Sequence, residues 1–360
     1  MDRELILPRR LPWHSAAWAS VQSLQRRGVH AVLLHGMRGI GKKSLGFDLA
    51  QAALCERPDP GGRACGRCSG CVLTEAGSHP DFRFVLPEAL KALRPGHVLD
   101  ESADEDADAS GEAADKPSKA SREIRIEQVR ALGEFATVAT HRGGGRVILL
   151  APAEALNAPA ANALLKLLEE PPERTLFILV SDALDELPPT IRSRCVLIRV
   201  AVPARAVALE WLTAQGVAEP ELALAAAGGA PIAAWEAEVG IGLDPEQRAL
   251  LLELLDHGDA LDVAEIVRRI PREMPIAPAV AVLQRWCWDL LGCRAAGTVR
   301  YYPARQASIA GLARRASSGA LWRWAETLAQ AQRSREHPLN ARLVLESLLF
   351  QYRGCLTATR

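Results

Sequence analysis

Short continuous runs of apolar residues mark three predicted strands in the first 200 positions. They cover residues 31–35, 146–150 and 175–180. Continuous apolar runs of this length, rich in branched side chains, are typical of strands covered on both faces in a parallel sheet. Between the second and third runs, residues 160–170 carry alanine and leucine at helical spacing, and Pro171 cannot continue that helix. Strand, helix and strand in this order predict a right-handed βαβ unit in an α/β core.

Helical periodicity dominates the other segments. Residues 13–28 predict an amphipathic helix before the first strand, a second helix follows that strand to about Leu54, and a third runs from near Ile124 to about Thr140. From about residue 204 the pattern is helical throughout, with helices expected at 204–215, 219–227, 245–257, 260–270, 274–294, 307–316, 319–335 and 339–354. The residues alone thus predict an α/β core followed by a helical bundle.

A glycine-rich loop joins the first strand to its helix, which is the context that a phosphate-binding loop requires. The loop matches the pattern G-x-x-x-x-G-K-[ST] as far as its lysine, and its candidate phosphate-binding residues are Gly36, Gly39, Gly41 and Lys42. The next position is Lys43, so the hydroxyl that would hold Mg²⁺ is missing, and Ser44 lies about 100° further round the helix. Weak nucleotide binding and a loop that only joins strand to helix both remain open, and metal-assisted hydrolysis is not expected.

Four cysteines follow with the spacing C-x9-C-x2-C-x2-C, namely Cys55, Cys65, Cys68 and Cys71. Closely spaced thiolates in a glycine-rich, turn-rich segment fit tetrahedral Zn²⁺, with Zn–S bonds near ~2.3 Å. Four protein ligands leave no open position for water, so we expect a structural zinc module at 55–71. The alternative is four unrelated thiols.

Charge is distributed unevenly along the chain. Residues 90–121 are rich in Asp, Glu, Ala, Ser and Gly, which predicts a disordered surface loop. Within it, residues 100–115 hold eight acidic residues and no Lys or Arg; because the formal net charge is zero, the other residues carry an excess of eight positive charges. A mildly basic body suits an acidic partner such as DNA, although ordinary surface charge is the simpler explanation.

The length of 360 residues is enough for two or three domains. No apolar run approaches the ~20 residues needed to span a bilayer, and the N-terminus lacks the layout of a secretory signal. We therefore expect a cytoplasmic protein with no membrane segment, whose eight cysteines are thiols or metal ligands rather than disulfides.

Two motifs in the central region resemble a known family. The first is Asn162-Ala-Leu-Leu-Lys-Leu-Leu-Glu-Glu-Pro-Pro172, and the second is Ser193-Arg194-Cys195, which follows the third predicted strand. Their order and spacing are similar to those of the clamp-loader branch of the AAA+ ATPases. A four-cysteine module after the first helix of the core also resembles bacterial clamp loaders. The likeness covers roughly residues 10–240, apart from the acidic insertion.

The resemblance implies a domain organisation. Residues 1–200 would form an α/β AAA+ core, a parallel sheet with helices on both faces, with the zinc module inserted at 55–71. A small helical lid would follow at 201–240. Residues 241–360 would form an all-α collar domain that assembles in a ring with other subunits.

The resemblance also indicates which ATP chemistry the chain has lost. In an active member the central strand ends in adjacent acids that orient Mg²⁺ and polarise the attacking water, whereas the matching positions here are Ala151 and Pro152. Glu154 follows two residues late. In the helical segment that normally carries a sensing arginine, the matching position is Ile232. Mg²⁺ binding and ATP hydrolysis by this chain are therefore not expected.

One element of the family's machinery is retained, the arginine of the second motif. In this family the residue that matches Arg194 points into the ATP site of a neighbouring subunit. A planar, permanently charged guanidinium there would stabilise charge on the transferring phosphoryl group. The alternative is an ordinary solvent-exposed loop arginine.

This combination implies a non-hydrolysing clamp-loader subunit, a stator and arginine-finger donor within a bacterial DNA polymerase III holoenzyme. The implied partners are ATP-hydrolysing clamp-loader subunits, the clamp-opening subunit, the sliding clamp and primed DNA, in a hetero-oligomeric ring associated with the nucleoid through the replisome. One alternative is an active AAA+ ATPase, such as a motor subunit, in which Ser44 and Glu154 replace the lost groups. Another is a zinc-dependent DNA-binding protein outside any ring.

Overall fold

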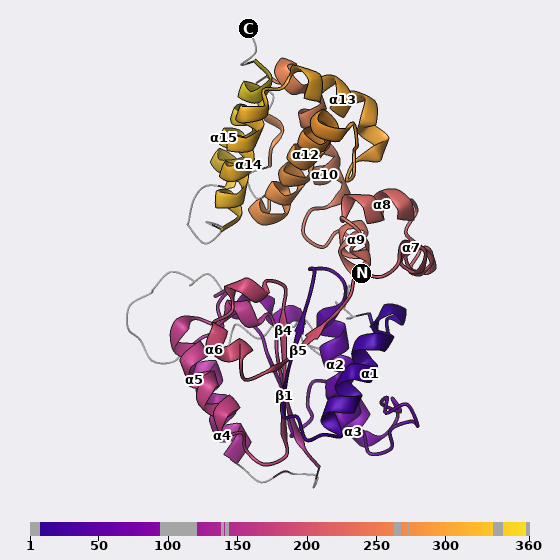
Figure 1. Ribbon diagram of the computed structural model, residues 1–360, viewed down its shortest axis with the longest axis vertical. Coiled ribbons are helices and arrows are strands. Elements are labelled where there is room, and N and C mark those ends of the chain that lie inside the picture. The colour runs from indigo at the N-terminus through magenta and orange to yellow at the C-terminus, as the bar shows by residue number, and fades with distance from the viewer. Residues whose placement is uncertain are drawn as a thin grey trace, which may run out of the picture. The chain divides into compact units, whose positions relative to one another are not determined.

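The computed structural model describes residues 8–93, 121–137, 140, 144–262, 268–271, 274–333 and 341–357. The chain divides into two compact units, Met1–Val202 and Pro203–Arg360. The first unit contains a sheet and helices, and the second is helical wherever it is described as regular structure (Figure 1). The acidic run at 100–115 lies outside the described residues.

Five parallel strands form one sheet in the order β2-β3-β4-β1-β5. They are β1 (Ala31–His35), β2 (Phe82–Val85), β3 (Arg146–Leu150), β4 (Thr175–Ser181) and β5 (Val196–Arg199). The three predicted strands are confirmed as β1, β3 and β4, which occupy the middle of the sheet and are almost wholly buried. Sequence analysis missed β2 and β5 because each is a four-residue edge strand with an exposed arginine, too short and too polar to stand out.

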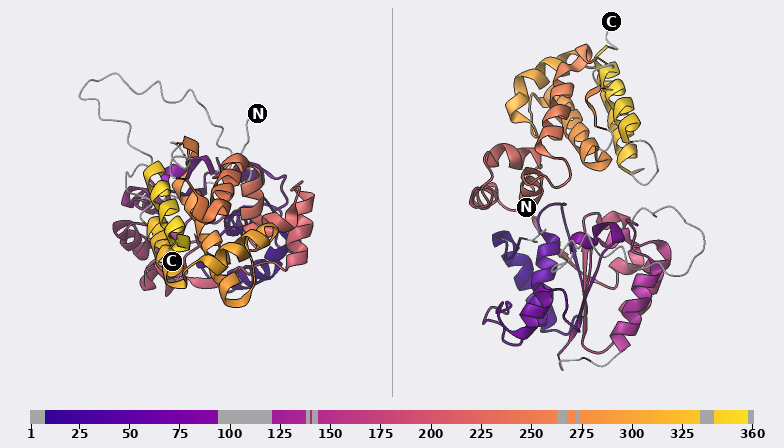
Figure 2. Two further views of the ribbon diagram at one scale, coloured as in Figure 1. Left: turned by 90° about the horizontal axis from the view of Figure 1, so that it is seen from above. Right: turned by 180° about the vertical axis from the view of Figure 1, so that it is seen from behind.

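Helices cover both faces of the sheet, as Figure 1 shows and Figure 2 repeats from behind. On one face lie α1 (Ser15–Gln25), α2 (Lys42–Ala53) and α3 (Ser69–Glu75). On the other lie α4 (Ile126–Thr137) and α5 (Ala158–Glu169). This confirms the predicted parallel sheet with helices on both faces.

The helix α5 begins two residues earlier than its apolar pattern predicted. The side chain of Asn157 accepts a hydrogen bond from the backbone N–H of Ala160 at 3.0 Å, which caps the helix, and Pro159 occupies its first turn. The shorter elements of this unit are η1 (Pro12–His14), η2 (Glu88–Leu93), η3 (Ala153–Ala155), η4 (Leu184–Glu186) and α6 (Pro189–Arg192).

The loop predicted at 90–121 starts later than expected, since η2 continues to Leu93. The reason is a pair of contacts between the two ends of the segment. The N–H of Ala89 donates to the carbonyl of Ser121 at 2.9 Å, and the N–H of Ser121 donates to Glu88 at 3.3 Å. Residues 94–120 lie outside the described residues.

The second unit consists of successive helices that match most of the predicted positions. They are α7 (Arg205–Ala214), α8 (Pro220–Ala226), α9 (Pro231–Glu238), α10 (Pro245–His257), η5 (Gly258–Ala260), α12 (Ile276–Ala296), η6 (Pro303–Arg305), α13 (Gln306–Arg315), α14 (Ser318–Arg333) and α15 (Ala341–Thr357). Helix α9 was not predicted. Of the expected helix at 260–270, residues 263–267 lie outside the described residues.

Two apolar clusters hold these helices together. Leu212 and Leu224 belong to a small cluster formed by α7, α8 and α9. A larger cluster surrounds Trp286, Trp324 and Tyr352 in the helices from α10 onward. The division of this unit into a lid and a collar domain remains a prediction. No helix in the described part of the chain is both long and apolar enough to cross a membrane.

A buried hydroxyl connects three helices of the larger cluster. The Tyr352 hydroxyl on α15 accepts a hydrogen bond from the indole N–H of Trp286 on α12 at 3.1 Å. It donates to the carbonyl of Leu255 on α10 at 2.7 Å. Burial raises the pKa of Tyr352 above its ordinary value, so the hydroxyl keeps its proton and continues to donate.

The substitution Tyr352→Phe should lower the free energy of unfolding of the second unit by about 1–3 kcal/mol, because the buried indole N–H of Trp286 loses its acceptor and the Leu255 carbonyl loses one of its donors. Urea denaturation followed by tryptophan fluorescence measures this loss. Tyr301→Phe is the matched control, because Tyr301 is only partly buried, and its effect should stay within about 0.5 kcal/mol. Equal losses for the two variants would contradict the assigned role.

Candidate functional site

The glycine-rich loop between β1 and α2 packs tightly against residues 11–14. Gly41 has a left-handed φ of 84°, and a Cβ atom there would lie 2.3 Å from the Leu11 side chain. The carbonyl of Ile40 accepts a hydrogen bond from the Trp13 indole at 2.9 Å, and His14 Nε2 lies 3.0 Å from the same oxygen. The loop is therefore braced by the short helix η1 and by glycine geometry.

The lysine of this loop is engaged by its own chain. Lys42 Nζ donates to the carbonyl oxygens of Gly36 at 2.8 Å and Met37 at 2.6 Å, and it forms an ion pair with Asp182 Oδ1 at 2.5 Å. A lysine ammonium has three N–H donors, so these three acceptors match its full capacity. The Lys42 side chain is only 2% exposed.

Further polar groups follow β3 and β4 at the same edge of the sheet. Glu154 lies in η3 after β3, and its Oε1 accepts a hydrogen bond from the N–H of Asp182 at 2.9 Å. Burial raises the pKa of Glu154 above its ordinary value. Ser181 Oγ accepts from the N–H of Ala183 at 3.1 Å. Ser44, one residue late for a metal-binding hydroxyl, is buried within α2.

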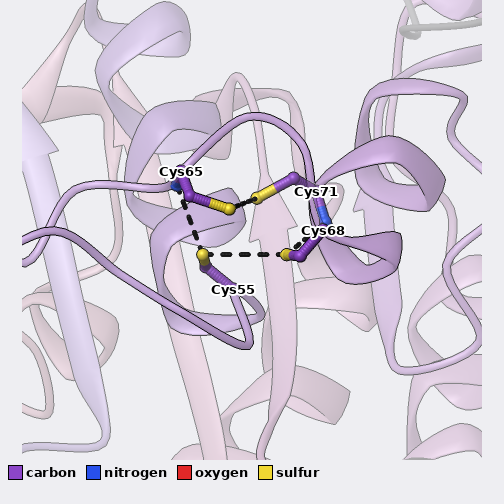
Figure 3. A group of neighbouring side chains, drawn as sticks. All are labelled: Cys55, Cys65, Cys68 and Cys71. Atoms are coloured by element: carbon purple, nitrogen blue, oxygen red, sulfur yellow. Dashed lines mark hydrogen bonds between the residues drawn. The ribbon is translucent and has the colours of Figure 1, made fainter.

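The sulfur atoms of the four cysteines lie together, all within 4.8 Å of one another (Figure 3). Cys55 Sγ is 3.8 Å from Cys68 Sγ, and Cys65 Sγ is 3.9 Å from Cys71 Sγ. A tetrahedron with Zn–S bonds of ~2.3 Å has S···S edges of about 3.8 Å. Both distances match this edge, so the cluster has the dimensions for a metal ion such as Zn²⁺.

Backbone N–H groups stabilise thiolate character in this cluster. The N–H of Cys65 donates to Cys55 Sγ at 3.3 Å, and the N–H of Cys71 donates to Cys68 Sγ at 3.4 Å. Hydrogen bonds from the N–H groups of Arg67 and Cys68 lower the pKa of Cys65 to about 6. Burial raises the pKa of Cys55 and Cys71 instead, so the hydrogen bonds favour the thiolate, which is the metal-binding form, most clearly at Cys65.

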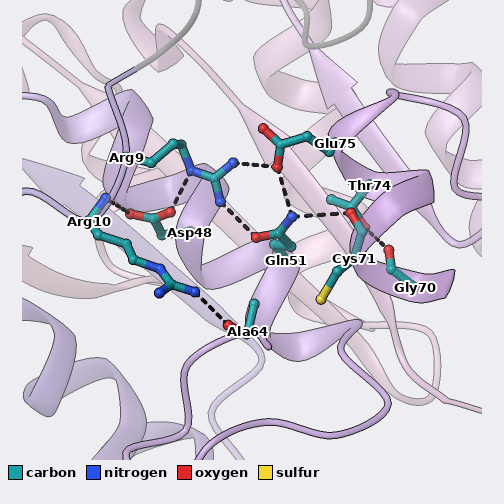
Figure 4. Close-up of polar contacts among 9 residues, drawn as sticks. All are labelled: Arg9, Arg10, Asp48, Gln51, Ala64, Gly70, Cys71, Thr74 and Glu75. Carbon is teal, nitrogen blue, oxygen red and sulfur yellow. Dashed lines mark hydrogen bonds and ion pairs between the residues drawn. The ribbon is translucent and has the colours of Figure 1, made fainter. Parts of the chain in front are cut away.

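A polar network fastens the cysteine segment to α2 and to the residues before α1 (Figure 4). The Arg9 guanidinium donates to Asp48 at 2.6 Å, to Glu75 at 2.8 Å and to Gln51 at 2.8 Å. Gln51 in turn donates to the carbonyl of Cys71 at 3.1 Å. One arginine therefore connects the N-terminal segment, the core helix α2 and the last cysteine of the cluster.

Arg194 lies just after the short helix α6, on the surface of the first unit. Its Nη1 donates to the carbonyl of Thr190 at 2.9 Å, and Ser193 Oγ is 3.4 Å away. Its Nη2 forms an ion pair with Glu169 at the end of α5. The Arg194 side chain is 33% exposed, so it can be reached from outside the unit.

The structure thus brings together some predicted site residues and separates others. Lys42 and Glu154 both approach Asp182, whereas the cysteine cluster is formed by a different segment, and Ile232 is a buried apolar residue of α9 in the second unit. Sequence analysis missed three partners, namely Asp182, Glu169 and Arg9. The signal for Asp182 was its place two residues after the predicted strand at 175–180.

Comparison with known proteins shows which family the chain is similar to. The family model described as DNA polymerase III, delta subunit, matches residues 17–204, which is more than half of the chain. DNA polymerase III subunit delta' of Pseudomonas aeruginosa is 39% identical over 246 residues, which cover 67% of this chain and 65% of the relative. The corresponding protein of Escherichia coli K12 is 33% identical over 200 residues, or 56% of this chain and 51% of the relative.

The chain therefore spans about half to two thirds of the length of the curated relatives that it matches. Among solved structures, a DNA polymerase III gamma subunit-related protein of Thermotoga maritima is 15% identical with a TM-score of 0.43, covering 94% of this chain and 99% of that one. The family match and the delta' relatives agree with the clamp-loader resemblance carried by the two central motifs. The chain belongs to the DNA polymerase III delta-subunit family, and the curated relatives named above are delta' subunits.

Proposed function

We propose that this chain is a delta'-type clamp-loader subunit that does not hydrolyse ATP and that supplies Arg194 to the ATP site of a neighbouring subunit. The observation that carries the proposal is a contrast between two cations of the first unit. Lys42, which would serve this chain's own nucleotide, is buried among three internal acceptors. Arg194, which would serve a neighbour's nucleotide, is at the surface.

The contacts of Lys42 argue against nucleotide binding in this chain. A phosphate would have to displace the Asp182 carboxylate and two loop carbonyls before it could reach the ammonium. It would also be repelled by the negative charge of Asp182, whose carboxylate lies 2.5 Å from the ammonium. We therefore expect weak nucleotide binding or none at Gly36, Gly39, Gly41 and Lys42, and no Mg²⁺ site.

The same contacts disfavour the alternative of an active ATPase. That function needs Glu154 to polarise water and Ser44 to hold Mg²⁺. Glu154 instead accepts a hydrogen bond from the backbone of Asp182, and Ser44 is buried in α2. One oxygen of Glu154 is thus held by the neighbouring backbone, and Ser44 is enclosed by the core.

An arginine finger needs a permanent positive charge that can reach the transferring phosphoryl group. A guanidinium provides this charge at any physiological pH and offers donors in a planar arrangement that matches phosphate oxygens. In other NTPases such a residue contributes about 10³–10⁵ in rate. Arg194 follows α6 and is partly exposed, and this position suits a role in trans.

The cysteine cluster fits structural zinc. When bound, the ion would cross-link Cys55, Cys65, Cys68 and Cys71 through four bonds and leave no position for substrate. The hydrogen bonds from Arg9 to Gln51 and from Gln51 to Cys71 would then hold the zinc-bound segment against α2. The zinc module is therefore proposed to have a role in folding rather than in chemistry.

The proposed partners follow from the delta' relatives. They are the ATP-hydrolysing subunits, the clamp-opening subunit, the sliding clamp and primed DNA, in a hetero-oligomeric ring of the cytoplasm and nucleoid. In this assembly the first unit is an AAA+ core without its own ATPase activity, and the second contributes the lid and the collar domain.

Metal removal tests the zinc proposal. The purified full chain should contain about one zinc ion, and Cys71→Ser should lose it to a chelator that leaves the wild type loaded, because three protein ligands hold the ion more weakly than four. Elemental analysis measures the stoichiometry. Cys293→Ser, which changes a cysteine outside the cluster, is the control and should retain full zinc content. Full zinc content in Cys71→Ser after the same chelator treatment would show that the cluster is not the site.

Nucleotide binding tests the role of Asp182. Isothermal titration of the wild-type chain with ATP should give no measurable heat of binding, whereas Asp182→Asn should raise the affinity at least about tenfold, or ~1.4 kcal/mol, because the competing charge is removed. Asp185→Asn removes a charge from the same loop without contact to Lys42 and should behave as wild type. Micromolar binding of ATP to the wild type would refute the proposal that Asp182 keeps nucleotide away from Lys42.

Reconstitution tests the finger. The ATP-hydrolysing subunits from the same organism would be assembled with this chain, clamp and primed DNA. Arg194→Ala should slow single-turnover hydrolysis at the adjacent site by about 10³-fold while the ring still assembles. Arg192→Ala, which changes the last residue of α6, is the control and should keep the rate. ATP hydrolysis by the isolated chain would favour the active ATPase instead.

A further inference from the structure

Both terminal nitrogens of the Arg194 guanidinium contact acceptors of the same unit. Glu169 is the last residue of α5, and its Oε1 pairs with Nη2 of Arg194. On the other terminal nitrogen, Nη1, the carbonyl of Thr190 accepts at 2.9 Å. The guanidinium is therefore held by acceptors from two separate elements, α5 and α6.

Both partners stand on rigid supports. Leu168, directly before Glu169, and Cys195, directly after Arg194, are buried in the same apolar cluster, together with Ile191 of α6. Because the backbones of these elements share one core, the spacing between the carboxylate and the guanidinium is set by packing. Only the side-chain torsions of Glu169 and Arg194 remain to be ordered.

Helix stability does not explain a carboxylate at this position. The C-terminus of a helix carries a partial negative charge, and an acidic side chain there is unfavourable by about 0.3–1 kcal/mol. Glu169 is the last residue of α5, and Glu170 is the C-cap. The side chain of Glu169 is 48% exposed, so its ion pair contributes little to folding. The contact has its effect on the arginine instead.

We propose that Glu169 is a positioning residue for the arginine finger. It restricts the guanidinium of Arg194 before a neighbouring nucleotide arrives, so that less side-chain entropy is lost when the phosphate is contacted. The partly exposed carboxylate leaves the guanidinium accessible to a second anion. This inference rests on the proposed function of Arg194.

The kinetic experiment uses the reconstituted clamp loader with Glu169→Gln. The amide has nearly the same shape but lacks the charge, so the neighbour's kcat for ATP should fall about fivefold, which corresponds to ~1 kcal/mol, with the KM for ATP unchanged. Glu169→Asp, which restores the charge, should recover part of the rate. Glu170→Gln removes the same charge one residue further on and should keep the wild-type kcat.

A second readout needs only the isolated full-length chain. Nitrogen-15 NMR of arginine side chains should show slow rotation of the Arg194 guanidinium in the wild type and in Glu170→Gln, and faster rotation in Glu169→Gln. Thermal unfolding should be the same for all three proteins. A purely structural role of Glu169 would change the unfolding transition and leave the rotation rate unaltered.

The outcomes separate this inference from the function on which it rests. If Arg194→Ala slows hydrolysis but Glu169→Gln keeps the wild-type kcat, the positioning role is refuted and the finger stands. If Glu169→Gln raises kcat or lowers KM, the carboxylate competes with the nucleotide, which also overturns the proposal. If Arg194→Ala has no effect in an assembled ring, the finger itself is wrong, and the positioning role is refuted with it.

Discussion

The parallel direction of all five strands is the constraint from which the polar chemistry of the first unit follows. Because the strands run the same way, the segments that leave β1, β3 and β4 emerge at one edge of the sheet. Lys42, Glu154 and Asp182 meet there although they lie far apart in the sequence. Burial of the central strands between two helical layers fixes the position of this edge. It thereby also fixes the contacts of Lys42 with Asp182 and with the carbonyls of the glycine-rich loop.

The two cations of the core have opposite environments. Lys42 is buried with an acceptor for each of its N–H donors, so its charge is compensated within the chain. Arg194 lies just after α6, in contact with Glu169 at the end of α5 and within reach of solvent. A lysine bound by its own chain and an arginine at the surface suit the proposed role of a subunit that acts on its neighbours.

The cysteine segment shows how a small, loop-rich insertion can be made part of a larger core. Its own apolar content is low, so packing alone would hold it weakly. Thiolate ligation would fix its internal shape, and the Arg9 network fixes its position on α2. Metal ligation and the Arg9 network would hold opposite ends of the same short helix, α3, because Cys68 is its N-cap and Glu75 is its last residue.

The sequence by itself determined the central strands β1, β3 and β4, most helices, the four cysteines and the arginine after α6, because apolar periodicity and motif spacing are local properties of the chain. It could not reveal the edge strands β2 and β5, whose four residues carry too little pattern. It also could not reveal that Asp182 meets Lys42 or that Glu169 meets Arg194. Those pairs depend on which strands and helices become neighbours, and only the tertiary packing of the sheet and its helices decides that.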